Sequence, residues 1–345
     1  MLSLYTCRSY LSLFYGNYTK TSNEYLKGCS LTEKISAIKN EVKKVMVGQE
    51  NLIDAMLIGL ISDGHILVEG VPGLAKTTAI NALAKALGLD FKRVQFTPDL
   101  LPSDIVGTEM YDQKEGTFKV KKGPAFTNLL LADEINRAPA KVQSALLEVM
   151  QEKQITIAED TFKLDEPFLV LATQNPVEQE GAYQLPEAQL DRFMLKVNVD
   201  YNSFEEEIEI VNRVANRNFG VIEKVADASD IISMREAVEK VHIDDEVTAY
   251  IVKLIYATRE PVKYGVQGIS EYLEYGASPR ASINLYKAAK AIAYIRGNDF
   301  VTPLDIADVV YGVLRHRIIL NYKAEAAGIT TDDIVTKILQ AIKLP

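Results

Sequence analysis

The sequence predicts an α/β domain, with a parallel sheet covered by helices on both faces, followed by a smaller all-helical domain. Three short apolar runs bounded by turn residues have the character of buried parallel strands, at 65–69, 128–132 and 168–172. Helical patterns separate these runs, and this alternation is typical of parallel sheets. After about residue 201 only helical patterns remain. We therefore expect a poorly ordered N-terminal extension over 1–29, the α/β domain over 30–201 and the helical domain over 202–345.

The composition is that of a globular protein. The 345 residues are 48% hydrophobic and 25% charged, with a formal net charge of −9 and a pI of about 5.1. No apolar run approaches the roughly 20 residues that cross a bilayer, so no membrane span is expected. An acidic surface repels phosphate backbones, which makes nucleic acid an unexpected partner. Cys7 and Cys29 lack metal-ligand spacing, and with no convincing signal sequence we expect a cytoplasmic protein.

Helix signals divide the chain further. Ser30 and Glu33 have capping-box spacing, and apolar residues at helical intervals follow as far as Gly48, after which a second apolar helix leads into the first strand. In the C-terminal part, helices are expected over 203–218, 231–241, 244–258, 279–296 and 303–317. Two inserts interrupt the α/β part. One is long and rich in turn signals, at 96–123, and the other alternates like a hairpin, at 154–164.

The segment after the first strand has the pattern of a phosphate-binding loop. It reads Gly70-Val71-Pro72-Gly73-Leu74-Ala75-Lys76-Thr77, and a helix-forming run starts at Thr78. Glycines let backbone N–H groups turn around a phosphate, and the helix N-terminus adds positive potential. Lys76 would reach the β- and γ-phosphates, and Thr77 would offer its hydroxyl to Mg²⁺. Ala75 stands where glycine usually precedes the lysine, so a less permissive residue must occupy that position.

Acidic and polar residues follow the second and third apolar runs. Asp133 and Glu134 come directly after a buried strand, and Asn175 follows the next one. Because the carboxyl ends of parallel strands meet at one edge of the sheet, these groups should lie beside the phosphate loop. Asp133 would hold Mg²⁺ and Glu134 would polarise an attacking water. Asn175 would contact the γ-phosphate or orient water, turn formation before Pro176 being the alternative.

These features, in this order, resemble an AAA+ ATPase, and longer stretches resemble the MoxR family in particular. The stretches are 70–77, 131–139 (LADEINRAP), 172–176 (ATQNP) and 185–193 (LPEAQLDRF), and the resemblance extends from Ser30 to the C-terminus. It implies a P-loop NTPase core of the AAA+ type with an all-α lid, and Mg²⁺-dependent ATP hydrolysis. Alanine before the loop lysine is itself typical of that family.

The resemblance also implies roles for residues outside the loop. Val47 and Gly48 match the segment that lines the adenine pocket, although Val-Gly at a helix end has an equally good structural explanation. Asn175 matches the sensor asparagine of the third strand. Arg192 matches the arginine finger, a cation that stabilises the charge of the phosphoryl group transferred from ATP bound by a neighbouring subunit.

Arg280 matches the second sensor arginine. Ser278 and Pro279 have the pattern of a helix start, so Arg280 would place a cation in the first helical turn. That position is mildly unfavourable for a cation, and a nearby phosphate would remove the conflict. An exposed arginine without a role is the alternative. The resemblance leaves open whether Arg280 serves the ATP of its own subunit or that of a neighbour.

The resemblance implies partners as well. We expect a homo-oligomeric ring, with six subunits, that acts as a chaperone-like activator or remodeller of client proteins, among them a von Willebrand factor A domain protein. The two inserts would face the ring pore. A nucleic-acid motor is one alternative, disfavoured by the acidic pI. A nucleotide-gated scaffold without turnover is another, disfavoured by Glu134, Asn175 and Arg192.

Overall fold

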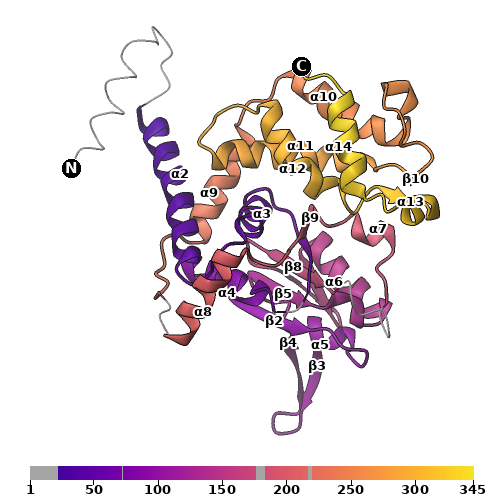
Figure 1. The fold of residues 1–345 in the computed structure, drawn as a ribbon. Helices are drawn as coiled ribbons and strands as arrows, with labels where there is room; N and C mark the ends of the chain where they lie inside the picture. Colours follow the sequence, from indigo (N-terminus) through magenta and orange to yellow (C-terminus); the bar gives the residue numbers. More distant parts are fainter. Residues whose placement is uncertain (1–21, 72, 176–182, 217–219) are drawn as a thin grey trace.

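The computed structural model describes residues 22–71, 73–175, 183–216 and 220–345. Expectations that concern residues 1–21, Pro72, 176–182 and 217–219 therefore lie outside the described residues. In the described part of the chain, no helix is long and apolar enough to cross a membrane. Figure 1 shows a sheet and its covering helices in the lower half of the molecule, with a second group of helices above them.

Five parallel strands form the central sheet, which confirms the α/β prediction. Their spatial order is β2–β5–β8–β1–β9. The strands span Ile66–Glu69 (β1), Phe91–Gln95 (β2), Leu129–Asp133 (β5), Leu169–Gln174 (β8) and Leu195–Asn198 (β9). The three predicted runs are the central strands β5, β8 and β1. The two edge strands were not predicted from the sequence.

Alternate residues of the strands pack against different layers. Ile66 and Val68 of β1 contact a core that includes α2 (Ser22–Lys43), α3 (Glu50–Ile61) and α4 (Lys76–Leu87). Leu67 faces the other side, where α5 (Pro102–Val106) and α6 (Ala140–Glu152) complete a second core. Since successive side chains of a strand point to opposite faces, both faces of the sheet are buried. The central strands are accordingly apolar at nearly every position.

The first helix differs from the sequence expectation. A capping box at Ser30 and Glu33 predicted a start at Ser30, but α2 begins at Ser22 and continues through that position. Residues 22–29, expected to belong to a poorly ordered extension, are therefore part of this helix. Ser and Glu three residues apart also occur inside helices, and the capping pattern alone does not distinguish the two situations.

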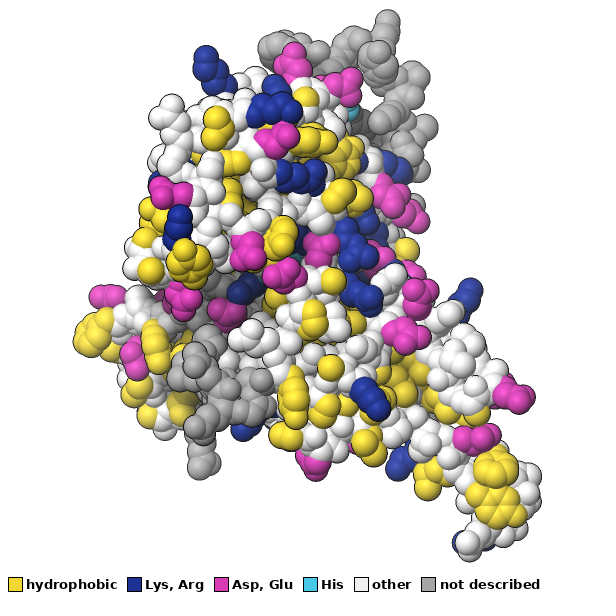
Figure 2. Space-filling view, turned by 90° about the vertical axis from the view of Figure 1, so that its right-hand side faces the viewer, with side chains coloured by type: hydrophobic (Ala, Val, Ile, Leu, Met, Phe, Trp, Pro, Cys, Tyr) yellow, Lys and Arg dark blue, Asp and Glu magenta, His cyan; other side chains and the backbone are white. Residues whose placement is uncertain are grey.

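Both inserts contain antiparallel hairpins. The predicted hairpin at 154–164 is confirmed as β6 (Gln154–Ile157) and β7 (Asp160–Lys163). The longer insert holds α5 and a hairpin of β3 (Gly107–Asp112) and β4 (Thr117–Lys122). The β3–β4 hairpin protrudes from the body of the molecule, with hydrophobic side chains near its end (Figures 1 and 2). Met110, Tyr111 and Phe118 of this hairpin are exposed.

The C-terminal part is helical, as predicted. The five expected helices are α8 (Phe204–Ala215), α9 (Ala228–Glu239), α10 (Asp245–Arg259), α11 (Pro279–Ile295) and α12 (Pro303–Leu314). Ser278 caps α11 as its sequence suggested, because its Oγ accepts from the backbone N–H of Arg280 at 3.1 Å. The sequence did not predict three further features: α13 (Tyr322–Ala327), α14 (Thr331–Ala341) and a short antiparallel pairing of β10 (Leu273–Tyr275) with β11 (Ile319–Leu320).

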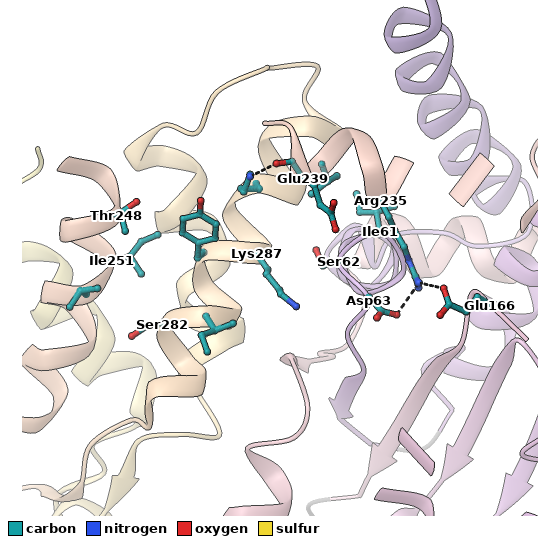
Figure 3. A pocket seen from close by; sticks show the side chains of 15 residues that line it. Ile61, Ser62, Asp63, Glu166, Arg235, Glu239, Thr248, Ile251, Ser282 and Lys287 are labelled. Carbon is teal, nitrogen blue, oxygen red and sulfur yellow. Dashed lines mark hydrogen bonds and ion pairs between the residues drawn. The ribbon is translucent and has the colours of Figure 1, made fainter. Parts of the chain in front are cut away.

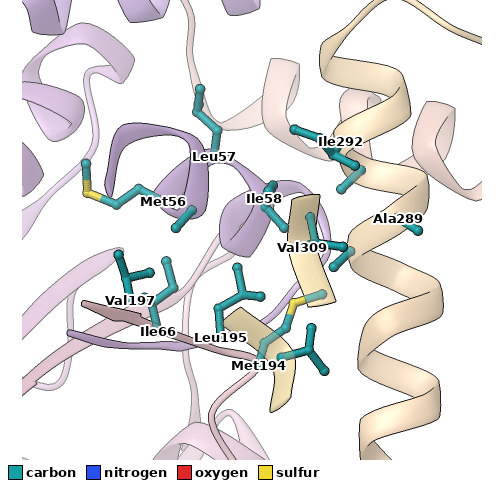
Figure 4. Packing of buried hydrophobic residues seen from close by; sticks show 14 of the residues in the cluster. Met56, Leu57, Ile58, Ile66, Met194, Leu195, Val197, Ala289, Ile292 and Val309 are labelled. Carbon is teal, nitrogen blue, oxygen red and sulfur yellow. The ribbon is translucent and has the colours of Figure 1, made fainter. Parts of the chain in front are cut away.

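One continuous core joins the helical part to the sheet. Figure 4 shows Met56, Leu57 and Ile58 of α3 beside Ile66 and the β9 residues, with α11 and α12 packed on the other side. Leu57 and Ile58 are almost fully buried. Burial of apolar side chains contributes about 25 cal/mol per Å² of surface removed from water, so this shared core fixes the helices relative to the sheet. The position of the C-terminal helices is therefore set by packing rather than by the chain connection alone.

Candidate functional site

The loop from Gly70 to Ala75 connects the end of β1 to the first turn of α4. A Cβ added at Gly70 would lie 2.5 Å from the carbonyl oxygen of Val199, so the close approach of the two chains requires glycine there. Gly73 has φ +90° and open space around its Cα. Ala75, the N-cap of α4, has φ 54° and ψ 20°. This left-handed conformation costs a non-glycine residue about 1–2 kcal/mol, and such strain is concentrated at functional sites.

Lys76 lies at the start of α4 with its side chain folded back over the loop. Its Nζ donates a hydrogen bond to the carbonyl oxygen of Gly70 at 2.6 Å. Burial lowers the pKa of Lys76, and the nearby charges of Asp133, Glu134 and Glu69 oppose that shift. The cation therefore lies among acids that it only partly neutralises. A phosphate in the loop would offer it a stronger partner than the carbonyl.

Asp133 and Glu134 end β5 beside the loop, and Thr173 of β8 links them. The Thr173 hydroxyl donates to Asp133 Oδ1 at 2.6 Å and accepts from the backbone N–H of Glu134 at 2.8 Å. Glu134 adopts a left-handed backbone conformation, with φ 55° and ψ 52°. Two acids and a strained residue at one strand end are the arrangement expected of a functional site rather than of a solvated strand end.

Side chains that sequence reasoning missed complete the acidic cluster. From the edge strand β2, Arg93 pairs with Asp133 Oδ2 at 2.6 Å through its Nη2, and Gln95 Nε2 donates to Glu134 Oε2 at 2.8 Å. Arg137, one turn beyond, also donates to Glu134 Oε2 at 2.9 Å. Arg93 and Gln95 are two residues apart and share one face of β2, so the alternation of a recognised edge strand would have placed both of them here.

The loop, Lys76, the two acids and Arg93 line one cavity of about 350 Å³, whereas Gln95 and Arg137 lie behind Glu134 and outside its wall. Its walls come from the loop, the start of α4, the strand β2 and the ends of β5 and β8: Gly70, Gly73, Leu74, Ala75, Lys76, Thr77, Thr78, Arg93, Asp133, Glu134, Thr173, Gln174 and Asn175. The structure therefore brings together every expected residue of this group except Val71, which is not in the wall, and Pro72, which lies outside the described residues. Asn175 is buried, with 6% of its surface exposed.

The residues present fit a nucleotide phosphate chain with a divalent cation. Backbone N–H groups at the start of α4 and the Lys76 ammonium suit anionic oxygens. The Thr77 hydroxyl and the Asp133 carboxylate are oxygen donors of the kind that Mg²⁺ prefers. Among the described residues, no group of three or more His, Cys, Asp or Glu side chains could hold a metal alone. Mg²⁺ commonly takes only one or two protein carboxylates and completes its shell with phosphate and water, so Thr77 and Asp133 suffice.

Val47 and Gly48 lie apart from this cavity wall, against the segment that leads into α8. The carbonyl oxygen of Val47 accepts from Asn202 Nδ2 at 3.0 Å. Gly48 has φ 68°, and a Cβ there would lie 2.5 Å from Glu206 Oε1. Val199, three residues before Asn202, packs closely against Gly70, so Val47 and Gly48 contact the same segment that touches the loop. The structure thus accounts for glycine at position 48 by its backbone conformation and its close packing.

Arg192 and Arg280 line a different cavity, of about 210 Å³. Arg192 donates from Nη1 to the carbonyl oxygen of Leu147 in α6 at 3.2 Å. It precedes β9, and Met194 bonds to the carbonyl of His65 just before β1, at 2.7 Å. Arg192 therefore lies at the amino ends of the strands, whereas the loop follows the carboxyl end of β1. The four residues of β1, roughly 13 Å at 3.3 Å per residue, separate the two edges.

Asp191 and Arg317 connect this second cavity to the helical part. Arg317 has 4% of its surface exposed, and burial lowers its pKa to about 10 despite the opposing effect of Asp191. Its Nε donates to Asp191 Oδ1 at 2.7 Å, and Ser278 Oγ donates to Asp191 Oδ2 at 2.9 Å. Arg280 Nη1 lies 3.8 Å from Asp191 Oδ2. Asp191 therefore ties together the segment that carries Arg192 and the cap of the helix that carries Arg280.

Comparison with known proteins agrees with this geometry. A family model described as "ATPase family associated with various cellular activities (AAA)" matches residues 65–195, and one described as "AAA lid domain" matches residues 267–338. Chaperone MoxR1 of Mycobacterium tuberculosis is 47% identical over 309 residues, which cover 88% of this chain and 81% of that protein. Protein MoxR of Methylorubrum extorquens is 27% identical over 89% of this chain and 94% of its own length. The crystal structure of a candidate ATPase from Cytophaga hutchinsonii is 53% identical, with a TM-score of 0.89 over 94% of this chain and 98% of that one.

Proposed function

Because the chain belongs to the MoxR family of AAA+ ATPases, and so binds and hydrolyses ATP, we propose that the cavity around the 70–77 loop is its catalytic site and that the site uses Mg²⁺. The observation that carries this proposal is the convergence of Lys76, Thr77, Asp133, Glu134 and Asn175 on one cavity of about 350 Å³. These residues come from three separate strand ends, and a parallel sheet brings such ends to one edge.

Each residue has a role that follows from its chemistry. Lys76 binds the β- and γ-phosphates, and Thr77 and Asp133 hold Mg²⁺, which supplies charge neutralisation on the phosphate oxygens when bound. Glu134 accepts a proton from the attacking water, and Asn175 positions the γ-phosphate or that water. Gln95 and Arg137 both donate to Glu134 Oε2, so Oε1 is the oxygen that would accept the proton from water. Val47 and Gly48, which lie outside the cavity wall, would line the adenine pocket, as the resemblance to the MoxR family implies.

We further propose that Arg192 and Arg280 act on ATP bound by a neighbouring subunit, so that the active form is a ring, with six subunits expected. The support is positional. Both arginines line the cavity at the amino ends of the strands, across the sheet from their own phosphate loop. Two cations converging on one cavity with a single carboxylate, Asp191, leave a positive excess that suits the phosphates of another copy.

The hydrolysis cycle would drive the remodelling of a client protein. A relative with 47% identity is named as a chaperone, and the resemblance to the MoxR family favours a client with a von Willebrand factor A domain. The protruding β3–β4 hairpin carries exposed Met110, Tyr111 and Phe118 beside lysines, a surface suited to transient contact with protein. If deletion of Glu159 and Asp160 from the β6–β7 hairpin left client activation intact, that hairpin would not be the effector.

A complementation assay tests the catalytic proposal. Glu134→Gln should bind ATP but release phosphate slowly. Arg192→Ala should be inactive, because each ATP site then lacks the arginine that the neighbouring subunit would supply. Mixing the two proteins should restore part of the activity, since some interfaces then combine an intact Glu134 with an intact Arg192. No recovery at any mixing ratio would count against action between subunits. Stimulation of hydrolysis by DNA would instead support a nucleic-acid motor, and absence of phosphate release in wild-type protein would support a scaffold.

A further inference from the structure

The helix α8 carries an apolar face that lies open to solvent. Phe204, Ile208 and Val211 are 74%, 48% and 60% exposed, and none of the residues of α8 is buried. Spacings of four and three residues put these side chains on one face of the helix. Glu205 and Glu207, both exposed, lie on either flank of that face. An amphipathic helix that leaves its apolar side in water marks an interaction surface.

A cavity of about 660 Å³ lies elsewhere on the molecule, between α3 and the helices α9, α10 and α11. Apolar side chains form much of its wall, among them Ile251, Val252, Ile283 and Tyr286. Figure 3 shows Lys287 extending from α11 into this space. The cavity therefore offers a hydrophobic surface together with the Lys287 ammonium, which has no ion pair among the described residues.

The other charges of the cavity are largely engaged within it. Arg235 Nη1 lies 2.9 Å from Asp63 Oδ1 and 3.3 Å from Glu166 Oε2. Lys290 donates to the backbone carbonyl oxygen of Glu239 at 2.7 Å. This hydrogen bond neutralises neither the Lys290 ammonium nor the Glu239 carboxylate. Arg235 and the two acids beside it sum to a charge of −1, whereas Lys287 and Lys290 face one carboxylate, that of Glu239, and sum with it to +1. The α11 side of the cavity is therefore net positive, and it is complementary to the acidic flanks of α8.

The face of α11 that lines this cavity is the one that carries Arg280. Ile283, Lys287 and Lys290 follow Arg280 by three, seven and ten residues, the spacing of one helical face. Ile283 also lines the smaller cavity that holds Arg192 and Arg280, so the two cavities lie next to each other along α11. If Arg280 acts on the ATP of a neighbouring subunit, the rest of this face must lie against that neighbour as well.

On the neighbour, the segment that leads into α8 lies beside the phosphate loop. The Val199 carbonyl packs against Gly70, Gln49 Nε2 donates to the carbonyl oxygen of Asp200 at 2.8 Å, and α8 begins four residues later at Phe204. If Arg280 of one subunit reaches the phosphates of its neighbour, the rest of that α11 face runs along the neighbour's surface next to the loop. We expect it to meet the apolar side of α8 there.

We propose that the α8 face of one subunit, comprising Phe204, Ile208 and Val211 with Glu205 and Glu207, docks into the α9–α10–α11 cavity of the next copy of this chain, where Lys287 meets the glutamates. The inference rests on the proposed action of Arg192 and Arg280 between subunits. Since the two surfaces are different parts of the same chain, the contact is head-to-tail and repeats around a closed ring. ATP hydrolysis in one subunit would then be coupled to the helical domain of its neighbour through α8.

Site-directed crosslinking tests the contact. In full-length chains in which Cys7 and Cys29 are replaced by serine, one protein carries Ile208→Cys and a second carries Ile283→Cys. Mild oxidation in the presence of ATP should give a disulfide-linked dimer in the mixture and little in either protein alone. Val262→Cys, on a surface residue that is 77% exposed and outside both surfaces, is the matched control in place of Ile208→Cys. Equal linking in the control, or linking of Ile208→Cys with itself, would overturn the proposal.

Charge reversal tests the polar part of the contact. Glu207→Lys and Lys287→Glu should each raise the protein concentration at which rings dissociate by roughly tenfold, equivalent to about 1.4 kcal/mol, and their combination in one chain should restore most of the loss. Circular dichroism should show unchanged folding, because both side chains are exposed. Dissociation unchanged by either reversal, while the Glu134→Gln and Arg192→Ala mixture still recovers activity, would refute this contact but leave the proposed function standing. Wild-type protein that forms no ring with ATP would instead refute the proposed function.

Discussion

Replacement of Arg317 by methionine should destabilise the protein strongly, because the side chain is buried and all of its donors are used. Its five N–H groups have acceptors at 2.5–3.2 Å, and four of these belong to the 191–194 segment that carries Arg192. Arg317→Met keeps a similar length but removes the close cation of Asp191, which is left with Arg280 at 3.8 Å. Breaking a buried pair in this way costs about 3–5 kcal/mol.

A double variant that replaces both Asp191 and Arg317 distinguishes the energy of the ion pair from that of the surrounding packing. Burial lowers the pKa of Arg317 to about 10, so pairing with Asp191 does not fully offset the cost of burying the cation. Asp191→Leu combined with Arg317→Met should therefore recover at least about 1 kcal/mol relative to the single Arg317→Met variant. Urea unfolding followed by circular dichroism measures both values. Arg317→Met within about 1 kcal/mol of wild type, or strictly additive single variants, would refute the reasoning.

Three further predictions concern particular side chains. Burial lowers the pKa of His65 to about 4, so the unfolded chain binds up to one proton more than the folded protein between pH 6.5 and 4. The unfolding free energy should therefore fall by up to about 3 kcal/mol as pH drops through that window. His65→Gln should reduce the dependence of the unfolding free energy on pH. The half-exposed Arg93 would compete with Mg²⁺ for the Asp133 carboxylate. Arg93→Gln should therefore lower the Mg²⁺ concentration for half-maximal ATPase activity by up to about fivefold. An unchanged Mg²⁺ concentration would argue against Asp133 as a ligand. Ala75→Gly should raise the unfolding free energy by up to about 1 kcal/mol by relieving the left-handed strain, and a lower value would show that no strain exists there.

The central part of the fold was predictable because its strands are buried on both faces. β1, β5 and β8 are apolar almost throughout, and that signal does not depend on tertiary context. The edge strands β2 and β9 carry Lys92, Arg93 and Lys196, as strands at a sheet edge commonly do. Their mixed polarity resembles that of a loop. Missing β2 also meant missing Arg93 and Gln95, which contact the two acids at the site.

The phosphate loop was predictable because its chemistry lies in a contiguous stretch with a strand before it and a helix after it. The link between Asp191, Arg317 and Ser278 was not predictable, since these residues are separated by as many as 126 positions and meet only through the packing of α11 and α12. The start of α2 was misplaced for the opposite reason. A local capping pattern at Ser30 suggested that the helix begins there, whereas the helix already begins at Ser22 and continues through Ser30.

The central claim is that the cavity formed by the 70–77 loop, Asp133 and Glu134 holds the triphosphate of ATP. Isothermal titration of Mg·ATP into the Glu134→Gln protein tests it most directly, with Lys76→Ala introduced in the same background as the comparison. We expect saturable binding in Glu134→Gln and loss of that binding when Lys76 is also replaced. Equal affinity in the two proteins would contradict it, because the lysine that lies over the loop could then have no part in holding the phosphates.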